Sequence, residues 1–583
     1  MTRILSDPDT FVAEALDGLV LAHADVLRRV EGGIARRSAL EPGKVAVIVG
    51  GGSGHYPAFA GIVGVGMPAA AVCGNIFSSP SAGQAVQVAR AVEVGGGVLF
   101  SYGNYAGDVI HFGEAERRLR DEGLDVRTVL VTDDIASAPV DEAEKRRGIA
   151  GDLCVFRIAG AAAERGDSFD EVERLARHAN DRTRTIGVAF SGCTVPGTIE
   201  PLFEVPEGMM SIGLGIHGEP GIRDVPVQGA EELARTLLEP LLEERPTGAG
   251  SRVSLIVNGL GTVKYEELFV LFGYLHRALE SAGITVASPL CGELVTSLDM
   301  GGVSVTLLWL DEELETLWDA PAASPAFRRG AVASSATAEA KALNRERSVE
   351  ADVVDRQPAS AASQRAAALA RELLSAARDA VIAESENLGA LDAIAGDGDH
   401  GIGMSRGLEA AVAAASAASA EHGLAALMAA AGESWSEVAG GTSGALWGAA
   451  LSTFGRIAEA AGAESAPALA DAVTAARERI VALGGAEAGD KTMLDALLPY
   501  EAELRRSIAE GSSVEEALRA AGTAATVAAE ATAALRPRKG RARPLAERSI
   551  GHPDPGAVSF ALVVEVVASR VDTGTEEREG ERS

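Results

Sequence analysis

Cysteine is scarce in this sequence and widely spread. Among 583 residues there are only 4 cysteines, and no two of them stand in the CxxC spacing of zinc and redox sites. A small secreted domain held by disulfides would be far richer in cysteine. The sequence therefore argues against a zinc site and a disulfide scaffold, and it predicts a reducing compartment. The four residues are Cys73, Cys154, Cys193 and Cys291.

Long apolar runs and an excess of positive charge are missing as well. No uncharged apolar stretch reaches the roughly 18 residues of a membrane-spanning helix, and the first ten residues lack the pattern of a secretory signal. Lys and Arg number 52 against 83 Asp and Glu, a formal net charge of −31. Such a chain repels nucleic acids and anionic lipid surfaces. We therefore predict a cytoplasmic protein with no nucleic-acid or membrane partner.

Strands and helices alternate in the first part of the sequence. Short β-branched runs stand between glycine turns and helix-like stretches, a pattern that predicts an α/β domain over residues 1–325 with ligands at the strand ends. The runs are Val45–Val49, Val98–Phe100, Val126–Val131, Ser254–Val257 and Val303–Leu310.

The second part has a different character. Alanine-rich amphipathic runs predict an all-α domain over residues 363–570. Residues 326–362 are rich in Ala, Ser, Arg and Glu and are interpreted as a linker, and residues 571–583 as a charged tail. The predicted helices include Gln364–Glu384, Leu408–Gly423, Ala468–Leu483 and Val514–Leu535.

An acidic glycine loop carries the clearest chemistry of the second part. Asp392, Asp397 and Asp399 lie within eight residues and alternate with glycine, which favours a loop between helices. Hard divalent cations take oxygen ligands, and Mg²⁺ that bridges nucleotide phosphates is a common use of clustered aspartates. An acidic capping turn is the alternative. An EF-hand loop does not fit the spacing, because no Glu stands at its twelfth position.

Other polar loops follow in the same part. Residues 440–444, Gly-Gly-Thr-Ser-Gly, precede an apolar helix and could present backbone N–H groups to phosphate oxygens, although a plain turn is the alternative. Residues 489–493 and 548–556 form further polar loops. This arrangement predicts a ligand at one end of a helical bundle or barrel.

Two histidines stand in glycine-rich loops of the first part. His55 follows the run Gly50–Gly54, and His217 lies in the run Gly213–Gly218. The second run matches the dinucleotide fingerprint, but Pro220 would stop the helix that a pyrophosphate needs, so we reject a Rossmann site. A histidine beside a carboxylate such as Asp108 can move a proton, and a neutral imidazole can attack a carbonyl. A structural role for either histidine is the alternative.

Taken together, these motifs resemble the single-chain, ATP-dependent dihydroxyacetone kinases. Their order and spacing agree along nearly the whole chain outside the linker and tail. The motifs that carry the resemblance are Gly50–His55, Ala71–Ser81, Asn104–Asp108, Gly215–Gly221 and Asp392–His400. The resemblance implies an α/β ketose-binding domain, an all-α helical-barrel nucleotide domain, ATP with two Mg²⁺ ions, and a homodimer.

The resemblance also implies roles for single residues. His217 would form a covalent hemiaminal with the carbonyl carbon of the ketose, while His55 and Asp108 would handle the proton of the attacking hydroxyl. Covalent capture of this kind would reject glycerol, which has no carbonyl. The implied ketose-binding residues are Gly52, Ser53, Gly54, His55, Gly103 and Asp108. The implied Mg²⁺ ligands are Asp392, Asp397 and Asp399. The implied nucleotide contacts are His400, Gly441, Thr442, Ser443, Gly484, Met493, Arg541, Asp554, Pro555 and Gly556.

Three positions depart from the family pattern. Gly103 stands where the family commonly has Lys, and Tyr56 and Phe59 stand where it has Glu and His. This variant pattern is similar to kinases of four-carbon ketoses, so erythrulose joins dihydroxyacetone as an expected substrate. The alternative functions are a sugar-sensing regulatory protein, without enzymatic activity or dependent on a phosphate carrier, and a side activity that cleaves FAD by cyclisation.

Overall fold

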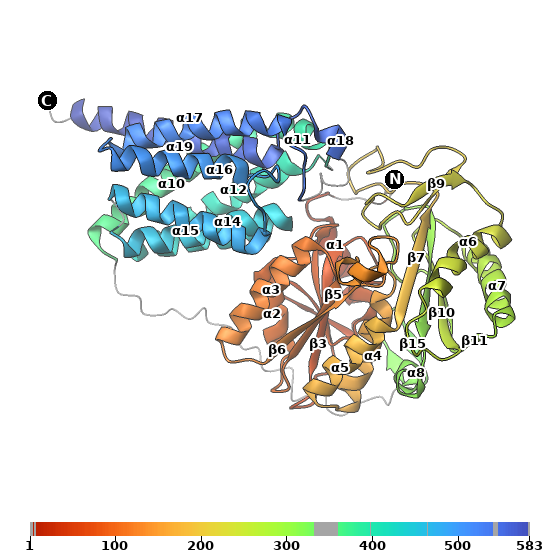
Figure 1. The fold of residues 1–583 in the computed structure, drawn as a ribbon. Helices are drawn as coiled ribbons and strands as arrows, with labels where there is room; N and C mark the ends of the chain where they lie inside the picture. The colour runs from red at the N-terminus through yellow and green to blue at the C-terminus, as the bar shows by residue number, and fades with distance from the viewer. Residues whose placement is uncertain are drawn as a thin grey trace. The chain divides into compact units, whose positions relative to one another are not determined.

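The chain folds into two compact units. The computed structural model describes residue 4 and residues 7–331, 359–396, 398–462, 465–539 and 546–580, with the backbone alone for 420 and 572–580. The units are Met1–Glu346 and Arg347–Ser583. Figure 1 shows strands confined to the first unit and a bundle of long helices in the second.

The first unit begins with a six-stranded sheet in the order β1-β2-β4-β3-β5-β6. The four strands from β4 to β6 run parallel, and β1 and β2 pair antiparallel at one edge. The strands are β1 Leu27–Val30, β2 Gly33–Arg36, β3 Ala46–Ser53, β4 Ala70–Ile76, β5 Val98–Gly103 and β6 Val126–Val131. Strand β3 is an apolar run because both faces of the sheet are covered.

Helices cover both faces of this sheet. One core joins alternate side chains of β3, β4 and β5 to α2 and α3, and the other joins the remaining set to α4 and α5. The helices are α1 Phe11–Ala22, α2 Ala82–Val92, α3 Ala106–Asp121, α4 Asp152–Arg165 and α5 Phe169–Asp181. A short 3₁₀ turn, Ala60–Ile62, follows the glycine loop after β3, and another spans Val140–Lys145.

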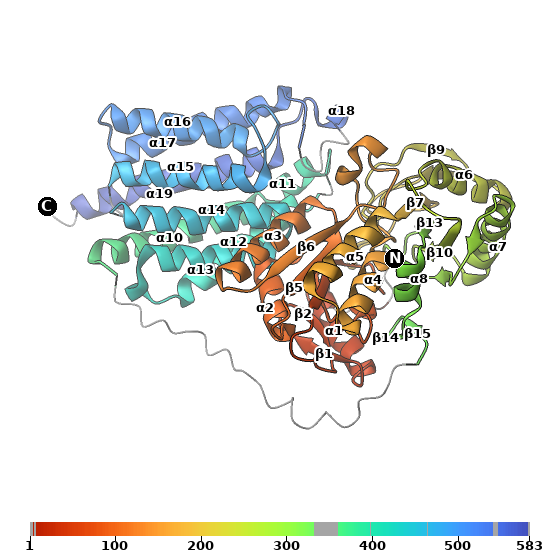
Figure 2. The same cartoon turned by 60° about the horizontal axis from the view of Figure 1, so that its bottom comes forward.

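A second sheet completes the first unit. Its order is β11-β10-β13-β7-β8-β9, with β12 also paired to β10, and most neighbours are antiparallel. Helices α6 Ala230–Glu243 and α7 Tyr265–Ser281 pack on it (Figure 2). The strands are β7 Thr183–Ala189, β8 Met209–Ile212, β9 Arg223–Pro226, β10 Arg252–Gly259, β11 Thr285–Val286, β12 Leu290–Gly292 and β13 Gly302–Trp309. Helix α8 Glu312–Asp319 and the hairpin β14 Ala322–Ala323 and β15 Arg328–Arg329 follow.

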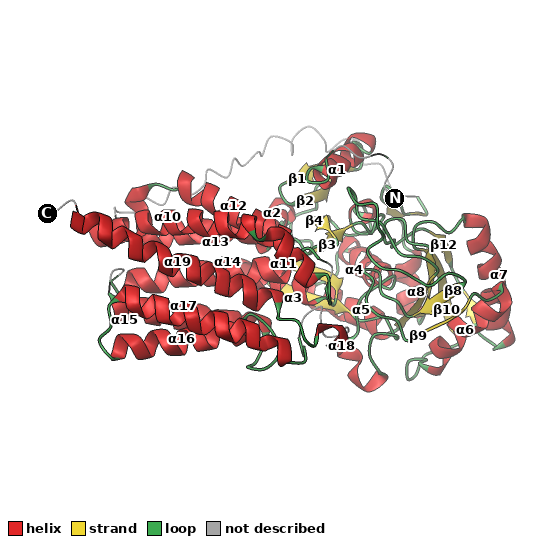
Figure 3. Cartoon of the chain, turned by 90° about the horizontal axis from the view of Figure 1, so that it is seen from above, coloured by secondary structure: helices red, strands yellow, loops and turns green. Residues whose placement is uncertain are grey.

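The second unit is entirely helical within its described residues (Figure 3). Small alanine side chains on the inward faces let the helices approach closely around Trp435, Trp447 and Tyr500. The helices are α10 Ala361–Ala383, α11 Ser385–Asp392, α12 His400–Ala417, α13 Gly423–Ala439, α14 Gly441–Ala460, α15 Ala466–Gly484, α16 Leu494–Ala509, α17 Val514–Ala531, α18 Ala546–Ser549 and α19 Pro555–Gly580. Two 3₁₀ turns, Ala420–His422 and Thr532–Ala534, lie between them.

The predicted fold class is confirmed. Each predicted β-branched run lies in or overlaps a strand, and each predicted alanine-rich run overlaps a helix. The Gly213–Gly218 run leads from β8 into β9 without a helix, in agreement with the rejected Rossmann site. All four cysteines are described and unpaired. Within the described ranges, no helix is both long and apolar enough to cross a bilayer.

The domain boundaries read from the sequence stay predictions. Strand β15 and the start of α10 fall inside the predicted linker, residues 326–362, and residues 332–358 of it lie outside the described part of the chain. Helix α19 continues to Gly580, within the range predicted as a tail.

Candidate functional site

The two histidines singled out in the sequence meet in the first unit. His55 follows the carboxyl end of β3, and His217 lies in the loop after β8. Their Nε2 atoms are 2.9 Å apart, although the residues are 162 positions apart in the sequence. His55 is only 2% exposed, and its Nδ1 is 2.7 Å from the backbone oxygen of Thr296. The structure thus brings two imidazoles into one polar row.

A partly buried ion network holds the His217 end of this row. Glu219 Oε1 is 3.1 Å from His217 Nδ1, and Glu219 Oε2 accepts the backbone N–H of His217 at 3.0 Å. Arg147 faces the same carboxylate at 3.6 Å and pairs with Asp134 at 2.7 Å. Burial by itself would raise the pKa of Glu219, but His217 and Arg147 outweigh it and hold the pKa well below its usual range. Glu219 is therefore a carboxylate at neutral pH.

Aromatic rings enclose the histidine pair. Phe77 stacks on His55 with ring centroids 5.0 Å apart and meets the edge of His217 at 5.2 Å. Tyr105 lies edge-on to His217 at 4.8 Å. Burial of the His55 ring, followed by the charge of His217, lowers the pKa of His55 to about 3. His55 is neutral at pH 7 as a result.

Asp108, in the first turn of α3, is the buried carboxyl predicted to act with the histidines. It is 7% exposed, and its Oδ1 has no hydrogen-bond partner among the described residues. Burial raises its pKa to about 7, against the effect of a hydrogen bond from Ser79. A carboxyl with such a pKa is half ionised near neutral pH, which suits a general base.

A second orphaned carboxyl lies close by. Asp152, the first residue of α4, is 3% exposed, and its Oδ1 likewise lacks a partner within the described chain. Burial first, and then the charges of Asp133 and Asp108, raise its pKa well above the usual range. The hydroxyl of Tyr105 is buried and without a described partner too. Orphaned polar atoms of this kind indicate a polar ligand.

The predicted glycine loop lines a cavity of about 620 Å³. Gly52, Ser53 and Gly54 line it together with Tyr56, Phe59 and residues of helix α1. Gly52 has no room for a side chain, because a Cβ there would lie 2.6 Å from the backbone nitrogen of Ser78. The loop can therefore pack against the backbone of Phe77 and Ser78 only if position 52 is glycine.

At Gly103, where the family that the sequence resembles commonly has lysine, neighbouring atoms leave little space for a side chain. A Cβ at Gly103 would lie 3.0 Å from the oxygen of Gly148 and 3.1 Å from the Tyr105 ring. At Gly148, in turn, a Cβ would lie 2.7 Å from Asp152 Oδ1. Glycine at position 103 therefore allows a close contact with the backbone of Gly148, next to Asp152, and does not leave an open space.

In the second unit, the acidic loop joins α11 to α12, as predicted. Asp392 ends α11, and Asp399 precedes His400 at the start of α12. Although Asp399 is exposed as a residue, desolvation of its carboxyl and then the charge of Asp392 raise its pKa to about 6. The described residues contain no group of three potential metal ligands. The third predicted ligand, Asp397, lies outside the described residues.

The loop nevertheless fits a hard cation. Its described donors are carboxylate oxygens, which Mg²⁺ prefers. A Cβ at Gly396 would lie 2.3 Å from Asp392 Oδ1, so glycine at this position leaves the space beside that oxygen open.

Several predicted nucleotide contacts gather at the same end of the helical unit. His400 Nε2 is 2.9 Å from the hydroxyl of Ser559, and its ring also donates a hydrogen bond to the backbone carbonyl of Pro555. Burial raises the pKa of Asp554 to about 7, with smaller effects from Asp495, Lys491 and Asp392. Gly556 faces Met493, with 3.6 Å from its Cβ position to the Met493 backbone.

The remaining predicted nucleotide contacts lie at helix ends or outside the described residues. Gly441, Thr442 and Ser443 form the first turn of α14. Gly484 ends α15, and its Cβ position lies 3.5 Å from Leu446 of α14. Arg541 lies outside the described residues.

Sequence reasoning missed several of these residues. Glu219, Tyr105 and Asp152 were given no role, although Glu219 stands only two positions after His217. Lys491 was also missed: it is 3% exposed and donates a hydrogen bond to the Ser549 oxygen at 2.6 Å. Lysine is seldom buried unless it is paired. The burial of Lys491 cannot be read from the sequence and is visible only in the fold.

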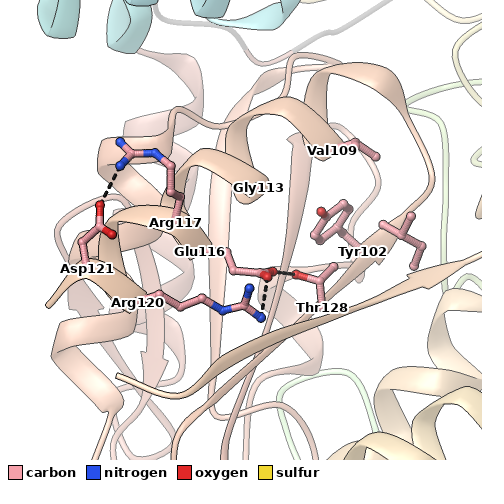
Figure 4. A pocket seen from close by; sticks show the side chains of 9 residues that line it. Tyr102, Val109, Gly113, Glu116, Arg117, Arg120, Asp121 and Thr128 are labelled. Atoms are coloured by element: carbon pink, nitrogen blue, oxygen red, sulfur yellow. Dashed lines mark hydrogen bonds and ion pairs between the residues drawn. The ribbon is translucent and has the colours of Figure 1, made fainter. Parts of the chain in front are cut away.

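A further cavity of about 390 Å³ lies between α3 and β6 and contains no predicted site residue (Figure 4). Its charges are paired: Arg117 binds Asp121, and Arg120 binds Glu116, which also accepts a hydrogen bond from Thr128. It offers no unpaired group to a ligand, so we assign the function to the two sites above.

Comparison with known proteins identifies the family of both units. Residues 17–326 match the Dak1 domain and residues 394–569 the DAK2 domain. An L-erythrulose kinase of Pectobacterium atrosepticum is 50% identical, covering 99% of this chain and 97% of the relative. A D-erythrulose kinase of Mycolicibacterium smegmatis is 48% identical, covering 99% of this chain and 100% of the relative.

A solved structure shares the same order of units. The dihydroxyacetone kinase of C. freundii in complex with AMP-PNP and Mg²⁺ is 29% identical with a TM-score of 0.52, covering 98% of this chain and 99% of that one. The predicted family is confirmed by these matches. The chain therefore belongs to the dihydroxyacetone kinase family, with a Dak1 domain followed by a DAK2 domain.

Proposed function

We propose that this protein is an ATP-dependent kinase of a short ketose, which it captures at His217 and phosphorylates on a terminal hydroxyl. The observation that carries the proposal is the contact of His55 and His217 at 2.9 Å beside the glycine loop, with the orphaned carboxyl of Asp108 in the same unit. The family and the full-length similarity to erythrulose kinases support a ketose kinase.

His217 acts as the nucleophile toward the ketose. Its Nε2 faces inward to His55, while its Nδ1 is occupied by Glu219. Attack of Nε2 on the carbonyl carbon gives a hemiaminal and places the sugar's terminal hydroxyl in a fixed position. A polyol such as glycerol cannot form this bond, so the step selects for a carbonyl.

Asp108 is the general base for the hydroxyl that attacks ATP. Its pKa of about 7 makes it a stronger base than an ordinary carboxylate, whereas His55, with a pKa of about 3, is a weak one. His55 contributes a hydrogen bond to the reacting sugar rather than removing its proton. Gly52, Ser53 and Gly54 line the sugar through backbone atoms.

The acidic loop of the second unit is the Mg²⁺ site. Asp392, Asp397 and Asp399 would hold two ions, which would supply the positive charge that offsets the phosphates of ATP. The first turn of α14, from Gly441 to Ser443, faces phosphate oxygens with its N–H groups. The other contacts predicted above, including Arg541, complete the nucleotide site.

Erythrulose is the preferred ketose. The support is twofold: Gly103, Tyr56 and Phe59 depart from the pattern of the three-carbon kinases, and the erythrulose kinases named above are 48–50% identical over the full chain. Asp152 and Tyr105 offer two orphaned polar atoms near Asp108 and His217, which suits a ketose with one hydroxyl more than dihydroxyacetone.

The quaternary state and location belong to the same proposal. The enzyme acts as a homodimer in the cytoplasm, where its phosphate donor is found, with domain limits at residues 1–325, 326–362, 363–570 and 571–583.

A substrate panel tests the proposal. ATP consumption is measured with L-erythrulose, D-erythrulose, dihydroxyacetone and glycerol, and we expect turnover with ketoses, highest with one erythrulose enantiomer, and none with glycerol. No turnover with any ketose would refute it. Phosphorylation that requires a phosphate-carrier protein in place of ATP would favour the regulatory or carrier-dependent alternative, and manganese-dependent cleavage of FAD would add the cyclising activity.

A further inference from the structure

The histidine pair forms one continuous row of hydrogen bonds. The row runs from the Thr296 oxygen to His55 Nδ1 at 2.7 Å, from His55 Nε2 to His217 Nε2 at 2.9 Å, and from His217 Nδ1 to Glu219 Oε1 at 3.1 Å. Each of the three gaps lies within hydrogen-bond distance. All four ring nitrogens are therefore engaged at once.

Counting protons along this row fixes its charge. The Thr296 carbonyl and the Glu219 carboxylate can only accept, so both Nδ1 atoms must carry a proton. The gap between the two Nε2 atoms needs a third proton, because two lone pairs at 2.9 Å would repel. Two neutral imidazoles carry only two N–H protons between them. The pair therefore holds one proton, and one positive charge, in excess.

The surroundings suit a cation on His217. The charged or titratable groups that face the row are Glu219, Arg147 behind it, and Tyr105, whose pKa burial holds well above its usual range. Burial keeps His55 neutral, with a pKa of about 3, so the charge belongs to His217. Asp134 neutralises Arg147 at 2.7 Å, which leaves the Glu219 carboxylate to balance His217.

We propose that Glu219 is a positioning residue that holds His217 as an imidazolium in the resting enzyme, and that the proton shared with His55 is the one delivered to the ketose oxygen. This inference rests on the proposed function for its second half. The Nε2–H bond of His217 breaks and its proton goes to the carbonyl oxygen, while the Nε2 electron pair forms the bond to the carbonyl carbon. The product is a neutral carbinol on a cationic imidazole, so the charge beside Glu219 is unchanged.

The proton count is tested by ¹⁵N NMR of the full chain without ligand, labelled at its 9 histidines. Spectra of His55→Asn and His217→Ala assign the two rings. At pH 7 we expect both nitrogens of His217 and Nδ1 of His55 to be protonated. In Glu219→Gln the amide is uncharged and can donate to Nδ1, so we expect the pair to hold two protons instead of three in the spectrum at pH 7. Glu219→Asp keeps the charge and should keep the third proton.

Kinetics provide the second readout. Glu219→Gln should lower kcat/KM for the ketose about 100-fold while the affinity for ATP is unchanged, and Glu207→Gln, an exposed carboxylate of the same unit, should alter neither. Two neutral imidazoles in the wild-type spectrum at pH 7 would overturn the proposal whatever the kinase assay shows. Three protons on the pair without phosphorylation of any ketose would instead refute the proposed function and leave the charge count standing.

Discussion

Burial sets the ionisation of single residues at the proposed ketose site. His55 and Asp108 carry ordinary titratable groups, but desolvation moves the pKa of His55 down to about 3 and that of Asp108 up to about 7. Both shifts favour the neutral form, and they separate the roles. A neutral His55 can hydrogen-bond throughout the working pH range, while Asp108 changes its charge within it.

Asp108→Asn should lower kcat about 10²- to 10⁴-fold, because an amide cannot accept the hydroxyl proton. Since the base works only when deprotonated, wild-type kcat should rise with pH through about 7 and then level off. Steady-state kinetics over pH 5–9 measure both effects. Asp224→Asn, on the exposed surface of β9, is the control and should keep the wild-type profile. A wild-type profile without a rise near pH 7 would remove Asp108 from the role of base.

Site residues that stand in a distinctive sequence motif could be predicted from the sequence. Site residues without such a motif could not. Glycines flank His55 and His217 and separate the aspartates, so the local pattern marks them. Asp152 sits in the first turn of a helix, where Asp is common as a helix start. What sets Asp152 apart is burial without a partner, and burial depends on how α4 packs against the sheet.

At the scale of elements, glycine allows a loop to approach a charged group. Gly215 does so for Glu219: a Cβ there would lie 2.1 Å from Glu219 Oε2 and 2.5 Å from Arg147 Nη1. The loop after β8 therefore brings His217 and Glu219 together only if this position has no side chain.

Gly215→Ala should displace Glu219 and lower kcat/KM for the ketose about 10- to 100-fold, as the loss of a supporting contact does at other sites. Steady-state kinetics measure the change. Gly229→Ala at the start of α6, where nothing lies within 4 Å of the added methyl group, is the matched control. Equal activity of the two variants would contradict the role given to this approach.

In the acidic loop, Gly396 lies beside a carboxylate as Gly215 does in the loop after β8. In Gly396→Ala the methyl group would lie 2.3 Å from Asp392 Oδ1, so the affinity for Mg²⁺ and ATP should fall about 10- to 100-fold while ketose capture is kept. Titration calorimetry with each ligand measures the two affinities. Gly403→Ala in α12, with open space around it, serves as the control. Unchanged nucleotide affinity in Gly396→Ala would argue against the metal site.

Whether a segment forms a helix or a strand was predictable, because the spacing of its apolar residues differs between the two. The run Val126–Val131 coincides with β6, and Val514–Leu535 covers α17. The pairing of strands was not predictable: β7, β10 and β13 form one antiparallel group from distant parts of the chain. The meeting of His55 with His217 depends on that topology, which local patterns do not encode.

For the whole molecule, two separate cores imply two separable binding functions. The proposed ketose-binding residues lie in the first unit, and the proposed metal and nucleotide residues lie in the second. The net charge of −31 disfavours the binding of a polyanion without metal. Carboxylates that hold Mg²⁺ would nevertheless allow this acidic protein to bind ATP.

Removal of divalent metal should therefore separate the two functions. With EDTA we expect ATP binding and turnover to be lost and ketose binding to persist, and excess Mg²⁺ should restore activity. Calorimetry with ATP and with ketose, before and after chelation, measures this. Loss of ketose binding upon chelation would show that the first unit depends on metal.

The most direct test of the account is the ¹³C NMR spectrum of the enzyme with erythrulose labelled at its carbonyl carbon. The account predicts that this carbon moves from the ketone region to that of a tetrahedral carbon bound to nitrogen, that His217→Ala abolishes the new signal, and that Mg²⁺ with ATP converts the bound sugar to a phosphate ester. A ketone signal that stays unchanged in the wild-type enzyme while phosphorylation proceeds would contradict covalent capture at His217.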